Sequence, residues 1–154
     1  MSSHRTTVTW KRQGQVFDPK VYCRDHVIRL EDGQTIAASG AAANLPPDTV
    51  GDQTADPEEL FVASLASCHM LWFLAIAARK RFVVDYYEDQ AHGDMANENG
   101  VIWMKQVQLR PLIQFGGDNQ PTAEQLTAMH QEAHQRCFIA NSVKTGVRIE
   151  PRSE

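Results

Sequence analysis

Two cysteines, Cys68 and Cys137, are the residues of this 154-residue chain whose types could carry out chemistry together. Cys68 lies near the middle of a long apolar stretch, and Cys137 directly follows a second helix-like segment. They are 69 positions apart, so no local CxxC or zinc-finger spacing joins them. If the fold brings them together, they form a dithiol that can cycle through a disulfide. If it does not, they are two small buried apolar side chains.

Reduction of a peroxide is the first chemistry that such a dithiol could perform. One thiolate attacks the peroxide oxygen, and the second thiol traps the resulting sulfenic acid before it is oxidised further. Cys68 lies about 12 residues, or roughly 18 Å, into its predicted helix, beyond the reach of the helix dipole. Apolar surroundings disfavour a thiolate, so a reactive Cys68 needs a cation from elsewhere. An arginine suits this role because its guanidinium stays charged when partly buried.

A carboxylate that could orient such an arginine is Glu58, in the first turn of the same predicted helix. Along a straight helix, Glu58 and Cys68 are about 15 Å apart. One arginine cannot easily contact both within that helix, but a second subunit could complete the arrangement across an interface. The alternative is that Glu58 only stabilises the positive end of the helix dipole.

The helix that positions these residues has a well-marked start. Asp56 is a good N-cap, Pro57 fits the first helical position, and Glu59 completes a capping-box pattern. We expect the helix to end near Lys80. Residues 60–78 contain no Asp, Glu, Lys or Arg, a run nearly long enough to span a membrane. The polar side chains at its centre favour the core helix of a compact protein instead.

Strand-like segments flank this helix on both sides. A hairpin turn is predicted at Asp32-Gly33, and a second one at Asn99-Gly100. A second helix is expected over Ala123–Arg136, capped by Thr122 with Gln125. The expected strands are Thr7–Trp10, Val21–Arg24, Val27–Leu30, Thr35–Ala37, a run that begins at Phe82, the long runs 86–95 and 101–115, and 147–150. This order predicts a single α+β domain over residues 1–154 with mostly antiparallel pairing, and a loop at 40–52 that could cover a site.

The composition narrows the function classes. The net charge of −4 argues against binding to a nucleic acid backbone, which needs a basic surface. Three cysteines are too few, and odd in number, for a secreted disulfide framework. No apolar run follows Met1, so the sequence predicts a cytoplasmic protein without a signal peptide and without attachment to a membrane.

Three motifs resemble the OsmC/Ohr family of osmotically induced and organic-hydroperoxide-resistance proteins. They are the run from Asp56 to Phe61 (DPEELF), the Ala66-Ser67-Cys68 triplet, and the strand that ends Ala91-His92-Gly93. The segment from Ala133 to Ser142 (AHQRCFIANS) is similar to the second cysteine motif of an OsmC-like branch. The resemblance extends from about Tyr22 to Pro151.

The resemblance implies a sheet wrapped around a long central buried helix, in an intertwined homodimer with its sites at the interface. It also implies that Cys68 is the attacking thiol and Cys137 the resolving thiol, with Glu58 as the orienting carboxylate. The arginine would come from the partner subunit, with Arg24 as the best match and Arg29 in reserve. No cofactor is expected, and the implied reductant is a dithiol such as a lipoyl group.

The implied substrate is an organic hydroperoxide. Phe61, Leu65 and Trp72 are the candidate residues that line its pocket, and their apolar side chains would favour it over hydrogen peroxide. The chain departs from the family where Phe138 replaces the proline that follows the second cysteine, and where His69-Met70 rather than an aromatic residue follows Cys68. These departures bear on the choice of peroxide and reductant.

Two other interpretations remain open. His130, His134 and Cys137 share one helical face, and with Cys68 or His69 they could bind zinc. Alternatively, the same dimer could be a non-catalytic protein that binds a small molecule or senses the redox state. Cys23 is expected to be a packed small residue.

Overall fold

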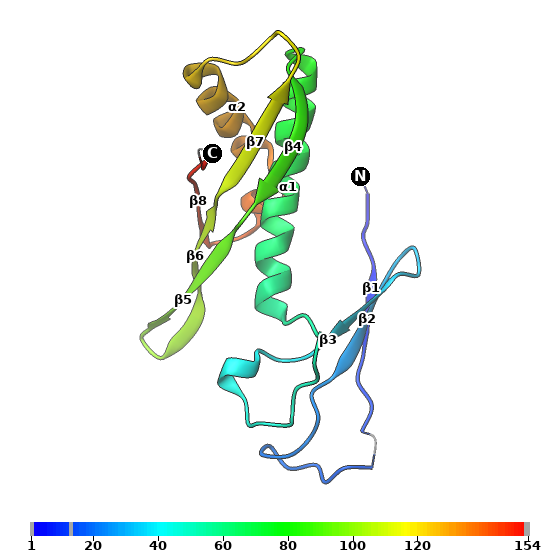
Figure 1. Ribbon diagram of the computed structural model, residues 1–154. Coiled ribbons are helices and arrows are strands. Elements are labelled where there is room, and N and C mark those ends of the chain that lie inside the picture. Colours follow the sequence, from blue (N-terminus) through cyan, green and yellow to red (C-terminus); the bar gives the residue numbers. More distant parts are fainter. Residues whose placement is uncertain (1, 13, 153–154) are drawn as a thin grey trace. The chain divides into compact units, whose positions relative to one another are not determined.

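The computed structural model describes residues 2–12 and 14–152 (Figure 1). The chain forms two compact units, residues 1–60 and residues 61–154. The helix α1 (Pro57–Arg79) begins in the first unit and continues through the second.

The first unit contains a three-stranded antiparallel sheet in the order β1 (Thr6–Thr9), β2 (His26–Leu30) and β3 (Thr35–Ala38). Gly33, with a φ of 93°, lies in the turn between β2 and β3, as the Asp-Gly pair predicts. The loop between β3 and α1 contains only the short 3-10 helix η1 (Ala42–Asn44). Three of the four early strands are thus confirmed.

The predicted strand at Val21–Arg24 is wrong, because the backbone there is a loop closed by side chains. The carbonyl of Tyr22 accepts a hydrogen bond from the Arg24 guanidinium at 3.0 Å. The carbonyl of Cys23 accepts one from the indole nitrogen of Trp10 at 2.8 Å. These carbonyls are engaged by side chains, so the β-prone composition of the segment does not produce a strand.

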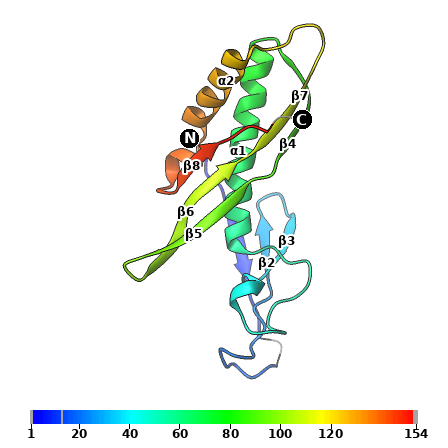
Figure 2. The same cartoon turned by 60° about the vertical axis from the view of Figure 1, so that its left-hand side comes forward.

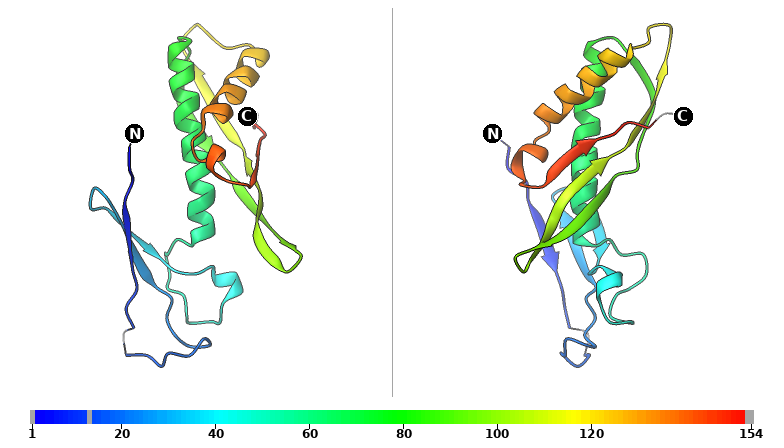
Figure 3. Two further views of the ribbon diagram at one scale, coloured as in Figure 1. Left: turned by 180° about the vertical axis from the view of Figure 1, so that it is seen from behind. Right: turned by 90° about the vertical axis from the view of Figure 1, so that its left-hand side faces the viewer.

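The second unit places its strands in two small sheets and its two helices on one face of them (Figures 1 and 3). One sheet pairs β4 with β7, and the other has the order β5, β6, β8. The elements are β4 (Val83–Asp89), β5 (His92–Glu98), β6 (Val101–Leu109), β7 (Pro111–Gly116), α2 (Ala123–Arg136), the 3-10 helix η2 (Ala140–Ser142) and β8 (Gly146–Ile149).

The hairpin that the sequence predicts at Asn99-Gly100 is present and joins β5 to β6. Asn99 and Gly100 both have positive φ values, 54° and 82°, as a two-residue I′ turn requires. The first long run is interrupted at Gln90 and Ala91, between β4 and β5, and the second at Arg110, between β6 and β7. The Arg110 amide donates to the Asp89 carboxylate at 2.6 Å, next to both interruptions. The pairing of β6 with β8 is parallel, whereas the other named strand pairs are antiparallel.

The apolar side chains of the second unit form two buried clusters. One joins α1 to α2 through Phe73, Ile76 and Met129, and aromatic side chains of β4 and β7 pack against it. The other joins α1 to β6 through Leu65 and Val107. Figure 2 shows α2 beside α1, on the same side of the strands.

One face of α1 is therefore buried, while Leu71 on another face is 60% exposed. By length and composition α1 is apolar enough to cross a membrane, as the core helix of a soluble protein can also be. Its packing against α2 and β6 buries Leu65, Phe73 and Ile76, but only 28% of its apolar window is buried within the chain, so α1 is less buried than the expected central helix.

Gly93 lies where β5 meets α1. A β-carbon at this position would lie 2.8 Å from a methyl group of Val62 and would also overlap the side chain of Met104. This close approach explains why the Ala91-His92-Gly93 motif ends in glycine.

Candidate functional site

The fold of the second unit brings Cys68 and Cys137 into contact. Cys68 lies in the middle of α1, and Cys137 is the C-cap residue of α2. The Cys68 side chain is close enough to Cys137 to contribute to the raised pKa of that thiol, and both are free thiols. Neither sequence spacing nor a local motif enforces this contact. It follows from the packing of α2 against α1.

Cys137 is held firmly by its own backbone. Its N–H donates to the carbonyl of His134 at 3.2 Å, and its carbonyl accepts from Asn141 at 3.0 Å. The amide of Ala140 donates to Sγ at 3.4 Å. The first amide of the 3-10 helix η2 is therefore hydrogen-bonded to this sulfur.

The two thiols differ in their access to solvent. Cys137 is 1% exposed, whereas Cys68 is partly exposed. Burial, with the neighbouring Cys68 as a second cause, raises the pKa of Cys137 to about 11. At neutral pH, Cys137 is a protonated thiol beside a more accessible one.

Two aromatic side chains are sequence neighbours of these thiols. Trp72 is one turn after Cys68, and Phe138 directly follows Cys137. Their rings meet edge to face with centroids 5.5 Å apart, and Phe138 remains 69% exposed. The guanidinium of Arg136 lies 5.6 Å from the Trp72 ring centroid. Sequence reasoning considered Trp72 but missed Arg136, although its position next to Cys137 was a usable signal.

A pair of buried histidines lies beside the dithiol. His69 Nε2 and His130 Nδ1 are 3.0 Å apart in a hydrogen bond that joins α1 to α2, and the rings are nearly parallel. The His130 ring also stacks on Phe73 with centroids 4.5 Å apart. Burial lowers the pKa of His69 to about 3 and that of His130 to about 4. Both imidazoles are therefore neutral at physiological pH.

The hydrogen bond within this pair bears on the zinc site that the sequence suggests at His130, His134 and Cys137. His130 directs Nδ1 to His69. Over the residues that the structure describes, no three His, Cys, Asp or Glu side chains are arranged to hold a metal ion. The geometry of the histidines is that of a hydrogen-bonded pair between helices.

The candidate residues of α1 lie at different depths. Glu58 is exposed in the first turn, where the capping box is formed by reciprocal bonds between Asp56 and Glu59 at 2.7 and 3.2 Å. Phe61 and Trp72 are partly buried. Leu65 has no exposed surface, so a ligand could contact it only if the apolar cluster opened.

Arg24 is tied into its own loop in the first unit. Its guanidinium donates to the carbonyls of Tyr22 and Pro19, at 3.0 and 2.7 Å, and lies 4.2 Å from the centre of the Tyr22 ring. It also borders a cavity of about 360 Å³ with a mostly apolar, aromatic lining. The lining residues are Val8, Trp10, Phe17, Tyr22, Arg24 and His26.

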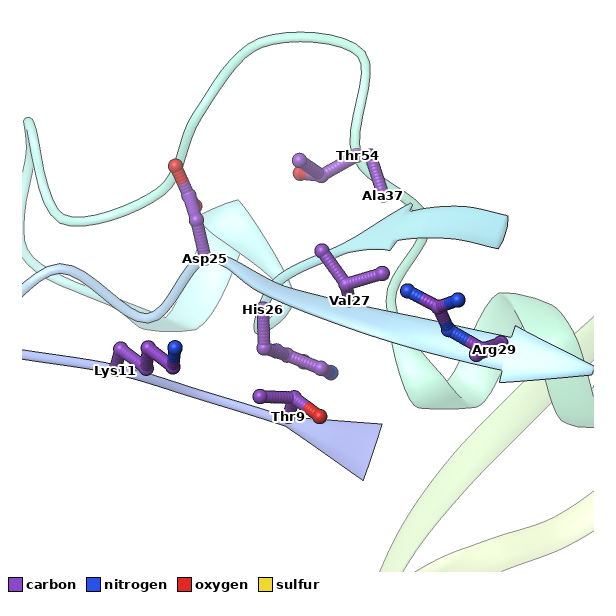
Figure 4. Close-up of a pocket in the computed structure, with 8 residues that line it drawn as sticks. All are labelled: Thr9, Lys11, Asp25, His26, Val27, Arg29, Ala37 and Thr54. Carbon is purple, nitrogen blue, oxygen red and sulfur yellow. The ribbon is translucent and has the colours of Figure 1, made fainter. Parts of the chain in front are cut away.

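Arg29, the reserve candidate, lines a different and more polar cavity of about 470 Å³ on the three-stranded sheet (Figure 4). Lys11 and Asp25 also line it. The Asp25 carboxylate accepts a hydrogen bond from the Gly51 amide at 2.8 Å. Cys23 is a free thiol that is only partly buried, and its carbonyl accepts the hydrogen bond from Trp10.

Comparison with known proteins identifies the family. The model of the OsmC-like protein family matches residues 50–152, which include both cysteines. An OsmC-like protein of unknown function from Vibrio cholerae is 44% identical, with a TM-score of 0.95 over 99% of this chain and 100% of that one. The chain therefore belongs to the OsmC-like family.

More distant structures have the same fold. An organic hydroperoxide resistance protein from Elizabethkingia anophelis is 18% identical, with a TM-score of 0.69 over 98% of this chain and 94% of that chain. One from Bacillus subtilis is 16% identical, with a TM-score of 0.66 over 98% of each chain. No functionally curated protein matches the chain.

Proposed function

We propose that this protein is a thiol-dependent peroxidase that reduces organic hydroperoxides to alcohols. The observation that carries the proposal is the contact between a partly exposed thiol, Cys68, and a buried thiol, Cys137. The chain also belongs to the OsmC-like family. Its more distant structural neighbours include organic hydroperoxide resistance proteins, which supports the proposal.

The reaction has three steps. The Cys68 thiolate attacks one peroxide oxygen, the O–O bond breaks, and the alkoxide takes a proton and leaves as an alcohol. The thiol of Cys137 then attacks the sulfenic acid of Cys68, and the disulfide forms as water leaves with the thiol proton. A cellular dithiol of the lipoyl type attacks this disulfide, becomes oxidised, and restores both thiols.

The environments of the two thiols support this division of roles. The attacking thiol must meet the peroxide, and Cys68 is the more accessible of the two. The resolving thiol needs only to reach its neighbour, and the high pKa of Cys137 keeps it from competing for the peroxide.

We further propose that the protein acts as a cytoplasmic homodimer. Exposed apolar residues, such as Leu71 on α1, would be covered by a second copy. In this arrangement Arg24 of one subunit lies near Cys68 of the other, and Glu58 orients it. The apolar cavity beside Arg24, with the partly buried Phe61 and Trp72, would favour an organic peroxide over hydrogen peroxide.

Consumption of cumene hydroperoxide with a dithiol reductant tests the proposal. We expect Cys68→Ser to reduce turnover to the background rate, and the matched control Cys23→Ser to retain it. Absence of turnover in the parent protein with lipoyl-type and other dithiols would show that the protein is not a peroxidase and would favour a binding or sensing role.

A further inference from the structure

The His69–His130 pair is an unusual interior feature because it leaves polar atoms unsatisfied. His69 is 1% exposed and His130 is 4% exposed. His69 Nδ1 and His130 Nε2 have no hydrogen-bond partner within the described part of the chain. Native interiors rarely contain such atoms, so they call for an explanation.

Counting the ring protons shows that neither tautomer removes the problem. Two neutral imidazoles carry two ring protons, and one of them lies in the bond between His69 Nε2 and His130 Nδ1. The other must lie on His69 Nδ1 or on His130 Nε2, where it is buried and unpaired. An apolar pair of similar size would avoid this cost, so stability alone does not explain the histidines.

The location of the pair indicates what it does. His69 directly follows Cys68 on α1. His130 precedes Cys137 by seven residues, about two helical turns, and so lies on the same face of α2. The other buried contacts between the helices include Phe73, Met129 and Ala133, which are apolar and have no directional preference. An ion pair between Arg79 and Glu132 at 3.6 Å also joins the helices, but it is solvent-exposed and contributes little. A directional hydrogen bond does specify one rotation of α2.

We propose that the His69–His130 pair is a positioning element that fixes the rotation of α2 on α1 and thereby holds Cys137 against Cys68. The inference rests on the proposed function only in its use of the disulfide. The contact between the thiols is present whatever the substrate is.

The quantity to measure is the effective concentration of one thiol toward the other. It is obtained by equilibrating the purified full chain in mixtures of reduced and oxidised glutathione and quantifying the Cys68–Cys137 disulfide by mass spectrometry. The same samples are unfolded with urea. This pairing of measurements separates the position of the thiols from the stability of the fold.

Four variants make the test specific. His130→Leu removes the hydrogen bond and the unpaired atom, and we expect it to keep or raise stability while the effective concentration falls about tenfold. His130→Asn, whose amide reaches the position of Nδ1, and His69→Gln, whose amide reaches that of Nε2, should each stay within about threefold of the parent. Met129→Leu repacks the same cluster without touching the pair and should leave the effective concentration unchanged.

An effective concentration in His130→Leu equal to that of the parent would overturn the proposal. So would an equal fall in Met129→Leu, because positioning would then come from packing in general, and so would a parent protein that forms no Cys68–Cys137 disulfide. A parent that forms the disulfide in a His130-dependent way but consumes no peroxide would support positioning and refute the peroxidase function.

Discussion

At the scale of single residues, the two thiols of the site have the same chemistry but differ in how far they are buried. Cys137 has almost no exposed surface and a pKa raised to about 11, whereas its neighbour Cys68 remains partly exposed. The roles that we propose for them depend on this difference. The difference in burial arises because Cys137 is the C-cap residue of α2, where the Ala140 amide of η2 donates to its sulfur.

We expect Cys137 to resist alkylation in the reduced, folded protein. At pH 8 a thiol with a pKa near 11 is a thiolate in about one molecule in a thousand. Brief treatment with iodoacetamide followed by peptide mass spectrometry should therefore label Cys68 well before Cys137. The same treatment in guanidinium should label the cysteines alike. Faster labelling of Cys137 in the folded protein would contradict its assignment as the resolving thiol.

Gly93 tests the close contact between β5 and α1. We expect Gly93→Ala to lower the free energy of unfolding by about 1–3 kcal/mol, because the added methyl group would overlap Val62 and Met104. Urea unfolding measures the change. Gly146→Ala is the matched control, since its β-carbon would meet only the Lys105 carbonyl at 3.5 Å. Equal stability of the two variants would show that β5 and α1 are farther apart than described.

At the scale of elements, the site depends on how α2 lies against α1. The start of α2 is fixed by a capping box in which Thr122 and Gln125 bond reciprocally at 3.2 and 2.9 Å. Its middle is fixed by the bond between His69 and His130, and its end by Cys137. The two helices thus carry the dithiol and the histidine pair on facing surfaces.

Acid should destabilise this helix pair. Burial lowers the pKa of His69 to about 3 and of His130 to about 4, and His130 and His134 also disfavour a charge on His69. In the unfolded chain both histidines titrate near 6.5. Between about pH 6.5 and pH 4 the unfolded state therefore binds more protons than the folded state, and stability falls as the pH falls.

We expect the free energy of unfolding to drop by roughly 2–4 kcal/mol between pH 7.5 and pH 5 from these two groups. Urea unfolding at both pH values measures it. His130→Leu should remove about half of the drop, whereas His92→Gln, at an exposed position of β5, should not change it. A drop of the same size in His130→Leu would mean that other groups cause it.

How far the sequence predicts this structure depends on the range of each interaction. Both capping boxes and the Asn99-Gly100 turn were predictable because their signals lie within a few residues. Val21–Arg24 was mispredicted because side chains of the loop and of Trp10 take the place of a strand partner.

The long-range part of the site could not be derived from spacing. The partners in the contact between Cys68 and Cys137 are 69 residues apart in sequence, and those in the bond between His69 and His130 are 61 apart. The resemblance to the OsmC family supplied the first pairing. The sequence shows that His130 and His134 share a helical face, and this favours a metal site. It does not show that the His130 ring is bonded to the ring of His69.

At the scale of the whole molecule, the proposed active site combines residues of two subunits. Arg24 belongs to the first unit of the chain, and Cys68 belongs to the second. Their cooperation across a dimer is a consequence of the proposed function, and it can be tested without knowing the physiological peroxide.

Mixed dimers provide this test. Arg24→Ala and Cys68→Ser should each be inactive alone. After subunit exchange at equal amounts, half of the dimers are mixed and each has one complete site, so about a quarter of the parent activity should return. Arg29→Ala mixed with Cys68→Ser is the control that distinguishes the two candidate arginines. If mixing restores nothing, Arg24 does not act across an interface.

The parallel pairing of β8 with β6 has a consequence for synthesis of the chain. The segment between these strands carries β7, α2 and Cys137, because parallel strands need a crossover connection rather than a tight turn. β8 follows α2 and Cys137 in the chain, so its pairing with β6 can form only after these residues have been synthesised. Completion of the sheet of β5, β6 and β8 is therefore a long-range step of folding that must wait for the whole crossover segment.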